Sequence, residues 1–106
     1  MAKIKVIIKE PGKEARLDYI ENTLEAIQKM VDGYIETLTF ASDAVIICDE
    51  EGKFKDKPYN CHLFGQDYVG TIIIAGVDGD SFSDFAPTVK DPLSLFSWME
   101  NIDGKR

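Results

Sequence analysis

Histidine and cysteine are scarce in this chain, which has one histidine and two cysteines among its 106 residues. A closed zinc site needs four ligands, commonly with cysteines in paired spacing. Cys48, Cys61 and His62 cannot supply four ligands without carboxylates, so we expect no bound metal and no cofactor. A disulfide is not expected either, because a reducing cytoplasm keeps thiols reduced.

The same scarcity argues against a cysteine nucleophile. Cys61 and His62 are adjacent, and neighbours in an extended segment point to opposite sides. Cys48 with His62 remains geometrically open, but no recognisable motif accompanies the pair. Glycine-rich phosphate-binding motifs and nucleophile elbows are also missing. We therefore assign no catalytic residue; enzymatic activity stays open, and absence of activity is the favoured interpretation.

Long hydrophobic runs are absent as well. The longest, residues 44–48 and 72–75, are far short of the roughly 18 residues that a membrane helix needs. The first ten residues alternate apolar and polar types and do not form the apolar core of a signal peptide. We expect a cytoplasmic protein with no membrane partner, and a single domain over residues 1–106.

Basic residues are outnumbered, with 19 acidic against 12 basic side chains and a net charge of −7. Surfaces that bind nucleic-acid phosphates need an excess of basic residues, so direct nucleic-acid binding is not expected. Lys53, Lys55 and Lys57 nevertheless alternate along one stretch. We interpret them as charge on a strand edge, where lysine blocks unwanted pairing, in preference to a phosphate-binding patch.

Alternating apolar residues predict strands in the first part of the chain. Lys3–Lys9 and residues 15–20 both alternate, and Pro11 and Gly12 between them indicate a turn, so a hairpin is expected. Residues 34–40 and 44–48 predict two further strands with a short turn between them. The second of these is apolar throughout, and a strand of that kind is central and covered on both faces.

A helix is expected between these two pairs of strands. Asn22 is the candidate N-cap, with Glu25 at the capping-box position three residues later. Gly33 would end the helix in a left-handed conformation. The apolar residues at helical spacing, which predict its buried stripe, are Leu24, Ile27 and Val31.

The second half of the chain is less regular. Lys53 and Phe54 are expected to pair back briefly after a turn, and residues 56–66 to form an ordered loop. Residues 68–75 predict one continuous central strand, followed by a loop over residues 77–89. Asp91 and Pro92 begin a final helix. Its expected apolar face consists of Leu95, Phe96, Met99 and Ile102.

Together these patterns predict an α+β fold. We expect a mostly antiparallel sheet of about five strands with two helices on one face, in the order hairpin, helix, strands.

Several polar residues occupy positions that core packing does not explain. Glu36 shares a strand face with large apolar residues, where a carboxylate is paired, edge-exposed or functional. Residues 49–52 have the composition of a solvated hairpin turn, and Asn60 suits a side chain that fixes a loop by bonding to the backbone. The candidate binding residues are Tyr34, Glu36, Asp49, Glu50, Glu51, Tyr59 and Asn60.

Segments spread over most of the chain carry a family resemblance. They are residues 9–13, 20–24, 33–36, 49–52, 58–60 and 70–72. In these segments the chain resembles DUF3846, a small domain-of-unknown-function family of phages, mobile elements and Gram-positive gut bacteria. The resemblance implies a small accessory protein of that setting and carries over no catalytic residue. A basic residue often follows the asparagine in the family pattern; Cys61 stands there in this chain, which argues against an anion-binding role for that loop.

Two classes of function follow. The favoured one is a non-catalytic binding module that docks on a host or phage protein, because the chain is small, acidic and without catalytic motifs. The alternative is a small-molecule or nucleotide-binding protein with a pocket near Tyr34, Glu36 and Asn60. Any functional surface is expected where residues 33–36, 49–52 and 59–60 meet at one end of the sheet.

Overall fold

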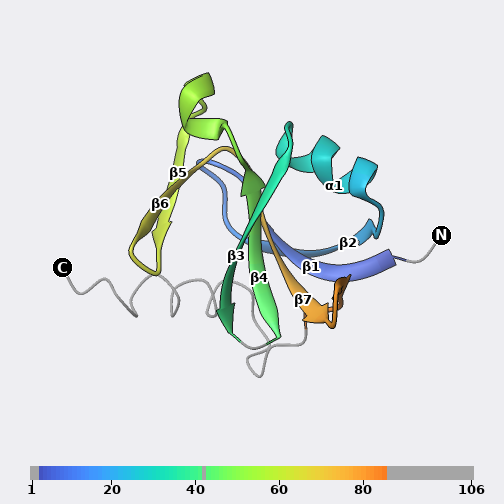
Figure 1. Cartoon of the computed structure of the whole chain (residues 1–106). Coiled ribbons are helices and arrows are strands. Elements are labelled where there is room, and N and C mark those ends of the chain that lie inside the picture. Colours follow the sequence, from blue (N-terminus) through green and yellow to red (C-terminus); the bar gives the residue numbers. More distant parts are fainter. Residues whose placement is uncertain (1–2, 42, 86–106) are drawn as a thin grey trace.

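The computed structural model of the chain describes residues 3–41 and 43–85, which form eight strands, one α-helix and one short 3₁₀ helix. In chain order the elements are β1 (Lys3–Lys9), β2 (Arg16–Glu21), α1 (Leu24–Val31), β3 (Ile35–Ala41), β4 (Ala44–Asp49), η1 (Gly52–Lys55), β5 (Tyr59–Leu63), β6 (Gln66–Val69), β7 (Ile72–Asp78) and β8 (Ser81–Ser83). The strands make a larger sheet and a separate two-stranded sheet (Figure 1).

The larger sheet has the order β2-β1-β7-β4-β3, and β8 pairs with the far end of β7. Every pairing in it is antiparallel. β4 and β7 lie inside the sheet, as their unbroken apolar sequences predicted, and every residue of β4 is buried. The expected hairpin of β1 and β2 is confirmed, with Lys3 opposite Glu21 and Ile8 opposite Arg16.

The two faces of this sheet are covered by different elements. Figure 1 shows α1 on one side of the sheet and the hairpin of β5 and β6 on the other. Because side chains alternate along a strand, Val45 and Ile47 of β4 face α1, whereas Ile46 and Cys48 face the hairpin. Strands covered on both faces are apolar at every position, which explains the continuous runs in the sequence.

The buried residues divide accordingly into two cores. The core on the side of α1 consists of Ile4, Val6, Ile8, Ile20, Ile27, Val31, Val45, Ile47, Ile73 and Ala75. The core on the side of the hairpin consists of Ile7, Ala15, Ala44, Ile46, Cys48, Cys61, Leu63, Tyr68, Ile72, Ile74 and Phe85. The larger sheet therefore contributes residues to both cores, one on each of its faces.

Helix α1 forms where it was expected, but its ends differ from the prediction. Thr23, not Asn22, is the N-cap, and its hydroxyl accepts a hydrogen bond from the Ala26 N–H. Asn22 donates instead to the carbonyl of Phe82 at 3.0 Å. At the other end Asp32, not Gly33, takes the left-handed conformation, with φ of 61°. Asp tolerates this region better than most residues, since its short polar side chain bonds locally.

The predicted stripe of α1 is only partly buried. Ile27 and Val31 are each 1% exposed, whereas Leu24 is 59% exposed. Leu24 is the first residue of the helix and is exposed there, so its helical spacing did not indicate burial.

The prediction of an α+β fold with a mostly antiparallel sheet is confirmed, but the strand count was too low. The stretch predicted as a loop, residues 56–66, contains β5, and the stretch 77–89 contains the end of β7 and β8. The expected strand 68–75 is broken by Gly70, whose φ of 71° cannot continue an extended strand. The pairing expected of Lys53 and Phe54 is replaced by η1.

The missed hairpin has a physical explanation. β5 and β6 are joined by Phe64 and Gly65, whose φ angles are 50° and 80°. A two-residue turn with both φ positive suits the twist of a hairpin, but Asn or Asp normally occupies its first position. Because Phe64 occupies this position, the sequence does not indicate a turn there. The Phe64 ring stacks on Phe40, with 5.0 Å between the ring centroids. The second predicted helix, from Asp91, lies outside the described residues.

Replacing Ile27 by alanine is expected to lower the free energy of unfolding by about 2–5 kcal/mol, because it empties a fully buried site between α1 and the sheet. Leu24→Ala is the matched control on the same helix and is expected to change it by no more than about 0.5 kcal/mol. Urea unfolding followed by circular dichroism measures both. Equal losses would mean that Leu24 belongs to the buried stripe after all.

Candidate functional site

Two of the candidate segments meet at one end of the larger sheet, as expected. Ile35 of β3 lies opposite Asp49 of β4, and Glu36 lies opposite Cys48. Beyond the last pair, the Glu50 N–H donates to the carbonyl of Tyr34 at 2.8 Å. Residues 33–36 and 49–52 therefore form one continuous piece of structure, which we call the Asp49 end.

The centre of this end is a buried carboxylate. The Asp49 side chain is 1% exposed, and its Oδ2 lies 2.7 Å from Lys57 Nζ and 2.9 Å from Lys55 Nζ. Its Oδ1 accepts a hydrogen bond from the Glu51 N–H at 3.0 Å. A buried carboxylate is tolerated when it is paired and hydrogen-bonded in this way. The predicted solvated turn is thus wrong for Asp49, although Glu50 and Glu51 are exposed.

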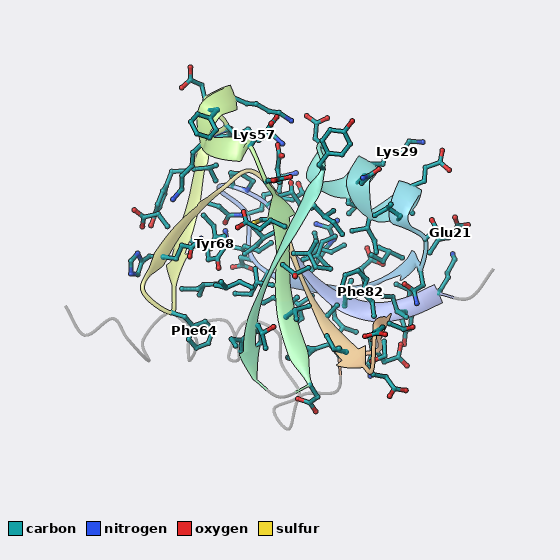
Figure 2. The ribbon with its side chains drawn as sticks, viewed as in Figure 1. Glu21, Lys29, Lys57, Phe64, Tyr68 and Phe82 are labelled. Carbon is teal, nitrogen blue, oxygen red and sulfur yellow. The ribbon has the colours of Figure 1, made fainter. Side chains whose placement is uncertain are left out.

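The same lysines close the C-terminal end of helix α1. Lys57 Nζ donates to the carbonyls of Val31 and Asp32 at 2.7 and 2.9 Å, and Lys55 Nζ donates to that of Asp32 at 3.2 Å. These carbonyls belong to the last turn of a helix, where a cation is favourable. Figure 2 shows Lys57 between the segment after η1 and the end of α1. We call Asp49, Lys55 and Lys57 the Asp49 network.

Glycines make room for this network. A Cβ on Gly33 would collide with the Asp49 carboxylate, lying 2.7 Å from Oδ2. A Cβ on Gly70 would lie 2.8 Å from Lys57 Cδ, and Gly70 also has a positive φ. Gly33 is therefore needed for close approach to Asp49, and not for ending the helix as the sequence had suggested.

The network holds Asp49 in its charged form. Burial on its own would raise the pKa of Asp49, but hydrogen bonds from Lys57, the Glu51 N–H and Lys55 outweigh it and lower the pKa to about 2. An aspartate held ionised and surrounded by ammonium groups is unsuited to proton transfer near neutral pH.

Asn60, on β5 of the two-stranded sheet, bonds to the same end of the larger sheet. Its amide donates to the carbonyls of Lys9 and Gly70 at 2.9 and 2.6 Å, and its Oδ1 accepts from Lys9 Nζ at 3.0 Å. This confirms the interpretation of Asn60 as a side chain that bonds the backbone. Tyr59 beside it is 59% exposed.

A small hollow opens between the ends of β3 and β4, η1 and β6. Its volume is about 170 Å³, and its lining includes Glu36, Cys48, Glu50, Lys53, Phe54 and Tyr68. We call it the Tyr68 pocket. Figure 2 shows Tyr68 on the hairpin of β5 and β6, toward the larger sheet. Glu36 belongs to the edge strand β3 and is exposed, which resolves the question of a carboxylate on an apolar face.

The two titratable groups at the base of this pocket are held neutral. Burial first, and then the charges of Glu36 and Asp49, raise the pKa of the Cys48 thiol to about 11. Burial also raises the pKa of Tyr68, with further contributions from Cys48, Cys61 and Glu36. Cys48 is thus a thiol at neutral pH, and thiols are poor nucleophiles.

The remaining candidates do not line the Tyr68 pocket. Tyr34 and Glu51 line a second hollow of about 340 Å³ beside α1, and Asn60 is engaged near Lys9. Lys57, Tyr68 and Phe54 were not among the candidate binding residues, and Lys57 had been interpreted as charge on a strand edge. Lys57 directly precedes the family-like segment 58–60, which was an available signal, whereas nothing in the apolar run around Tyr68 distinguished its hydroxyl.

A family model described as a domain of unknown function, DUF3846, matches residues 4–96. The chain belongs to the DUF3846 family. No curated protein and no solved structure matches the chain. Because DUF3846 has no assigned activity, its name adds no role for any residue. Three residues of the segments in which the sequence resembles the family, Gly33, Asp49 and Gly70, lie in or against the Asp49 network.

Two further observations concern residues 3–41 and 43–85 alone. No cluster of three or more His, Cys, Asp or Glu side chains in them is arranged to hold a metal ion. Within the same residues no helix has the length and apolar character needed to cross a membrane.

Acid is expected to destabilise this DUF3846 protein through Asp49. Its pKa is about 2 in the folded chain and close to 3.8 without the network, so its contribution is complete above about pH 5 and is lost as the pH falls toward 2. The loss should be about 2 kcal/mol. Unfolding curves between pH 6 and pH 2 measure it. Asp49→Asn should flatten the dependence, and the exposed Asp80→Asn should leave it unchanged; a wild-type slope in Asp49→Asn would contradict the assignment.

Asn60 and Glu36 are expected to respond differently to substitution. Asn60→Ala removes bonds to two backbone carbonyls and should lower the free energy of unfolding by about 1–3 kcal/mol. Glu36→Gln, on an exposed edge, should change it by no more than about 0.5 kcal/mol. Chemical denaturation measures both. A stable Asn60→Ala variant would show that these bonds are replaced by water and that Asn60 is available for another role.

Proposed function

We propose that this DUF3846 protein is a non-catalytic binding module that contacts another protein through its Asp49 end. The partner we propose is a host or phage protein, in the cytoplasm of a cell that carries the phage or mobile element. The setting rests on the family resemblance of the sequence. The mode of binding rests on the geometry of this end.

The observation that carries the proposal is a pair of exposed aromatic rings on a fixed base. Tyr34 is 70% exposed and Phe54 is 90% exposed. Both residues are close in the chain structure to the Asp49 network. The Tyr34 carbonyl accepts a hydrogen bond from the Glu50 N–H, next to Asp49, and Phe54 lies in η1 directly before Lys55. Aromatic residues are enriched in protein interfaces, where they bury a large area at little cost in conformational entropy. A ring held out by a rigid turn is preorganised for such a contact.

The chemistry of the site supports a binding role over a catalytic one. Asp49 has its charge offset by two lysines, and Cys48 is held as a thiol. The exposed carboxylates around the rings, Glu36, Glu50 and Glu51, match the net charge of −7 and favour a partner with a basic surface.

The alternative of a small-molecule or nucleotide site near Tyr34, Glu36 and Asn60 has less support. Tyr34 and Glu36 line different hollows, and the polar atoms of Asn60 bond to Lys9 and Gly70. The Tyr68 pocket carries Glu36 and Glu50, which would repel a phosphate. Its volume of about 170 Å³ is also below the roughly 300–1,000 Å³ typical of ligand sites. The hollow of about 340 Å³ that Tyr34 lines is large enough, but its lining includes neither Glu36 nor Asn60.

A photo-cross-linking residue in place of Phe54 is expected to capture a protein in the native host, because position 54 would lie inside the interface. The same residue in place of Tyr19, which is 57% exposed on the edge strand β2, is the matched control and should capture no such partner. Cross-linked products are identified by mass spectrometry. Tyr34→Ser should reduce capture from position 54 at least several-fold while the melting temperature stays unchanged. Equal capture from positions 19 and 54, or undiminished capture by Tyr34→Ser, would overturn the proposed surface.

A further inference from the structure

The hydroxyl of Tyr68 is the least explained polar group of the described structure. Tyr68 is 2% exposed, and within residues 3–41 and 43–85 its hydroxyl oxygen is buried without a hydrogen-bond partner. Buried polar groups in native proteins are nearly always satisfied, and an exception calls for a specific reason. Phenylalanine would fill the same core position without this cost. The side chain lines the pocket together with Glu36 and Cys48. Its hydroxyl oxygen is not open to solvent there, so a group that enters the pocket contacts this oxygen only when the Tyr68 ring shifts toward it.

The charges around the pocket favour a cation. Glu36, Glu50 and Asp67 line it, against one lysine, Lys53. Asp49 also lines it, but its carboxylate is already paired with two ammonium groups outside the pocket lining. Asp67 bonds to the ring of His62 at 2.7 Å, and Lys53 is an exposed side chain on η1. The two carboxylates on the side of β3 and β4, Glu36 and Glu50, remain to receive a positively charged group.

The dimensions of the pocket favour a single side chain. A cavity of about 150 Å³ holds a benzene-sized group, so a hollow of about 170 Å³ suits one planar head group with part of its chain. The exposed ring of Phe54 stands at its rim, and Val69 adds an apolar wall. A guanidinium group is planar, stacks on aromatic rings and donates to several acceptors at once.

We infer that the Tyr68 pocket receives an arginine side chain of the partner protein. The guanidinium donates to Glu36 and Glu50, while its face lies against Phe54. The buried oxygen of Tyr68 becomes a third acceptor when the Tyr68 ring shifts toward the bound group. This inference rests on the proposed function and names the residue type that its partner must present. Arginine is among the residues that most often dominate the binding energy of interfaces.

The test uses the folded chain and three blocked amino acids. Nα-acetyl-arginine amide is titrated into ¹⁵N-labelled protein and followed by amide chemical shifts. Nα-acetyl-citrulline amide, which has the same shape without the charge, and Nα-acetyl-lysine amide are the comparison probes. The arginine probe is expected to give saturable shifts at Glu36, Glu50 and Tyr68, with at least ten-fold weaker binding of the citrulline probe. Raising the salt concentration should weaken the arginine binding.

Two variants tie the binding to named groups. Tyr68→Phe removes only the hydroxyl and should weaken the arginine probe at least three-fold while the protein stays folded. Glu36→Gln, on the exposed edge strand, should weaken it by a similar factor. Tyr19→Phe on β2 is the matched control and should bind as the wild type does. Equal binding of arginine and citrulline, shifts away from the pocket, tighter binding of lysine, or full binding by Tyr68→Phe would each overturn the inference.

The outcome separates this inference from the proposed function. If position 54 captures a partner but the arginine probe does not bind, the protein-binding surface stands and the arginine pocket is wrong. If the probe binds and Tyr68→Phe also lowers partner capture, the pocket is part of the interface. If the probe binds while Tyr68→Phe captures the partner undiminished, the source of the guanidinium is a free small molecule, and the assignment to a partner side chain is overturned.

Discussion

The buried carboxylate of Asp49 is the constraint on which one whole end of the molecule depends. Removing a carboxylate from water costs several kcal/mol unless close charges and hydrogen bonds offset it. Here Lys55, Lys57 and the Glu51 N–H supply them. Because Lys57 also bonds to the last carbonyls of α1, one charge fixes the end of β4, the 3₁₀ turn, the approach to β5 and the end of the helix.

This arrangement changes the meaning of the alternating lysines. Their spacing suggested charge on the edge of a strand, but the segment forms η1, and Lys55 and Lys57 turn toward Asp49. Lys55 and Lys57 are therefore structural residues that pair with Asp49, and of the three lysines only Lys53 fits the prediction, as an exposed charge outside the Asp49 network. Gly33 and Gly70 belong to the same arrangement, since a Cβ at either position would displace the groups of the network. Several DUF3846-like segments are therefore explained by packing around one ion pair cluster.

At the Asp49 end, the residues that hold the structure together differ from the residues that face outward, and the binding proposal concerns the second group. Asp49 and Asn60 have their polar atoms engaged inside the protein, whereas the exposed residues next to them include aromatic rings, carboxylates and Lys53. A rigid base under exposed rings reduces the ordering that a partner would have to impose. The Tyr68 hydroxyl differs from both sets of residues. It is buried, as the polar atoms of Asp49 and Asn60 are, but it has no hydrogen-bond partner among the described residues.

The sequence by itself determined the parts of the structure that depend on local pattern. Continuous apolar runs identified β4 and β7 as central strands, alternation identified the hairpin of β1 and β2, and helical spacing located α1. The pairing of β3 with β4 followed from the short turn between them, and with it the meeting of Glu36 and Asp49. These features are readable because their causes lie within a few residues of one another.

Tertiary structure alone decided the features whose causes are distant in sequence. Whether Asp49 is a solvated turn residue or a buried ion depends on lysines from the next segment and a glycine from the preceding one. The hairpin of β5 and β6 was hidden because Phe64, stabilised by Phe40 far away in the chain, occupies a position that usually signals a turn with Asn or Asp. Tyr68 looked like any apolar strand residue, and only the packing of that hairpin against β4 placed it in the lining of a pocket with Glu36 while burying its hydroxyl.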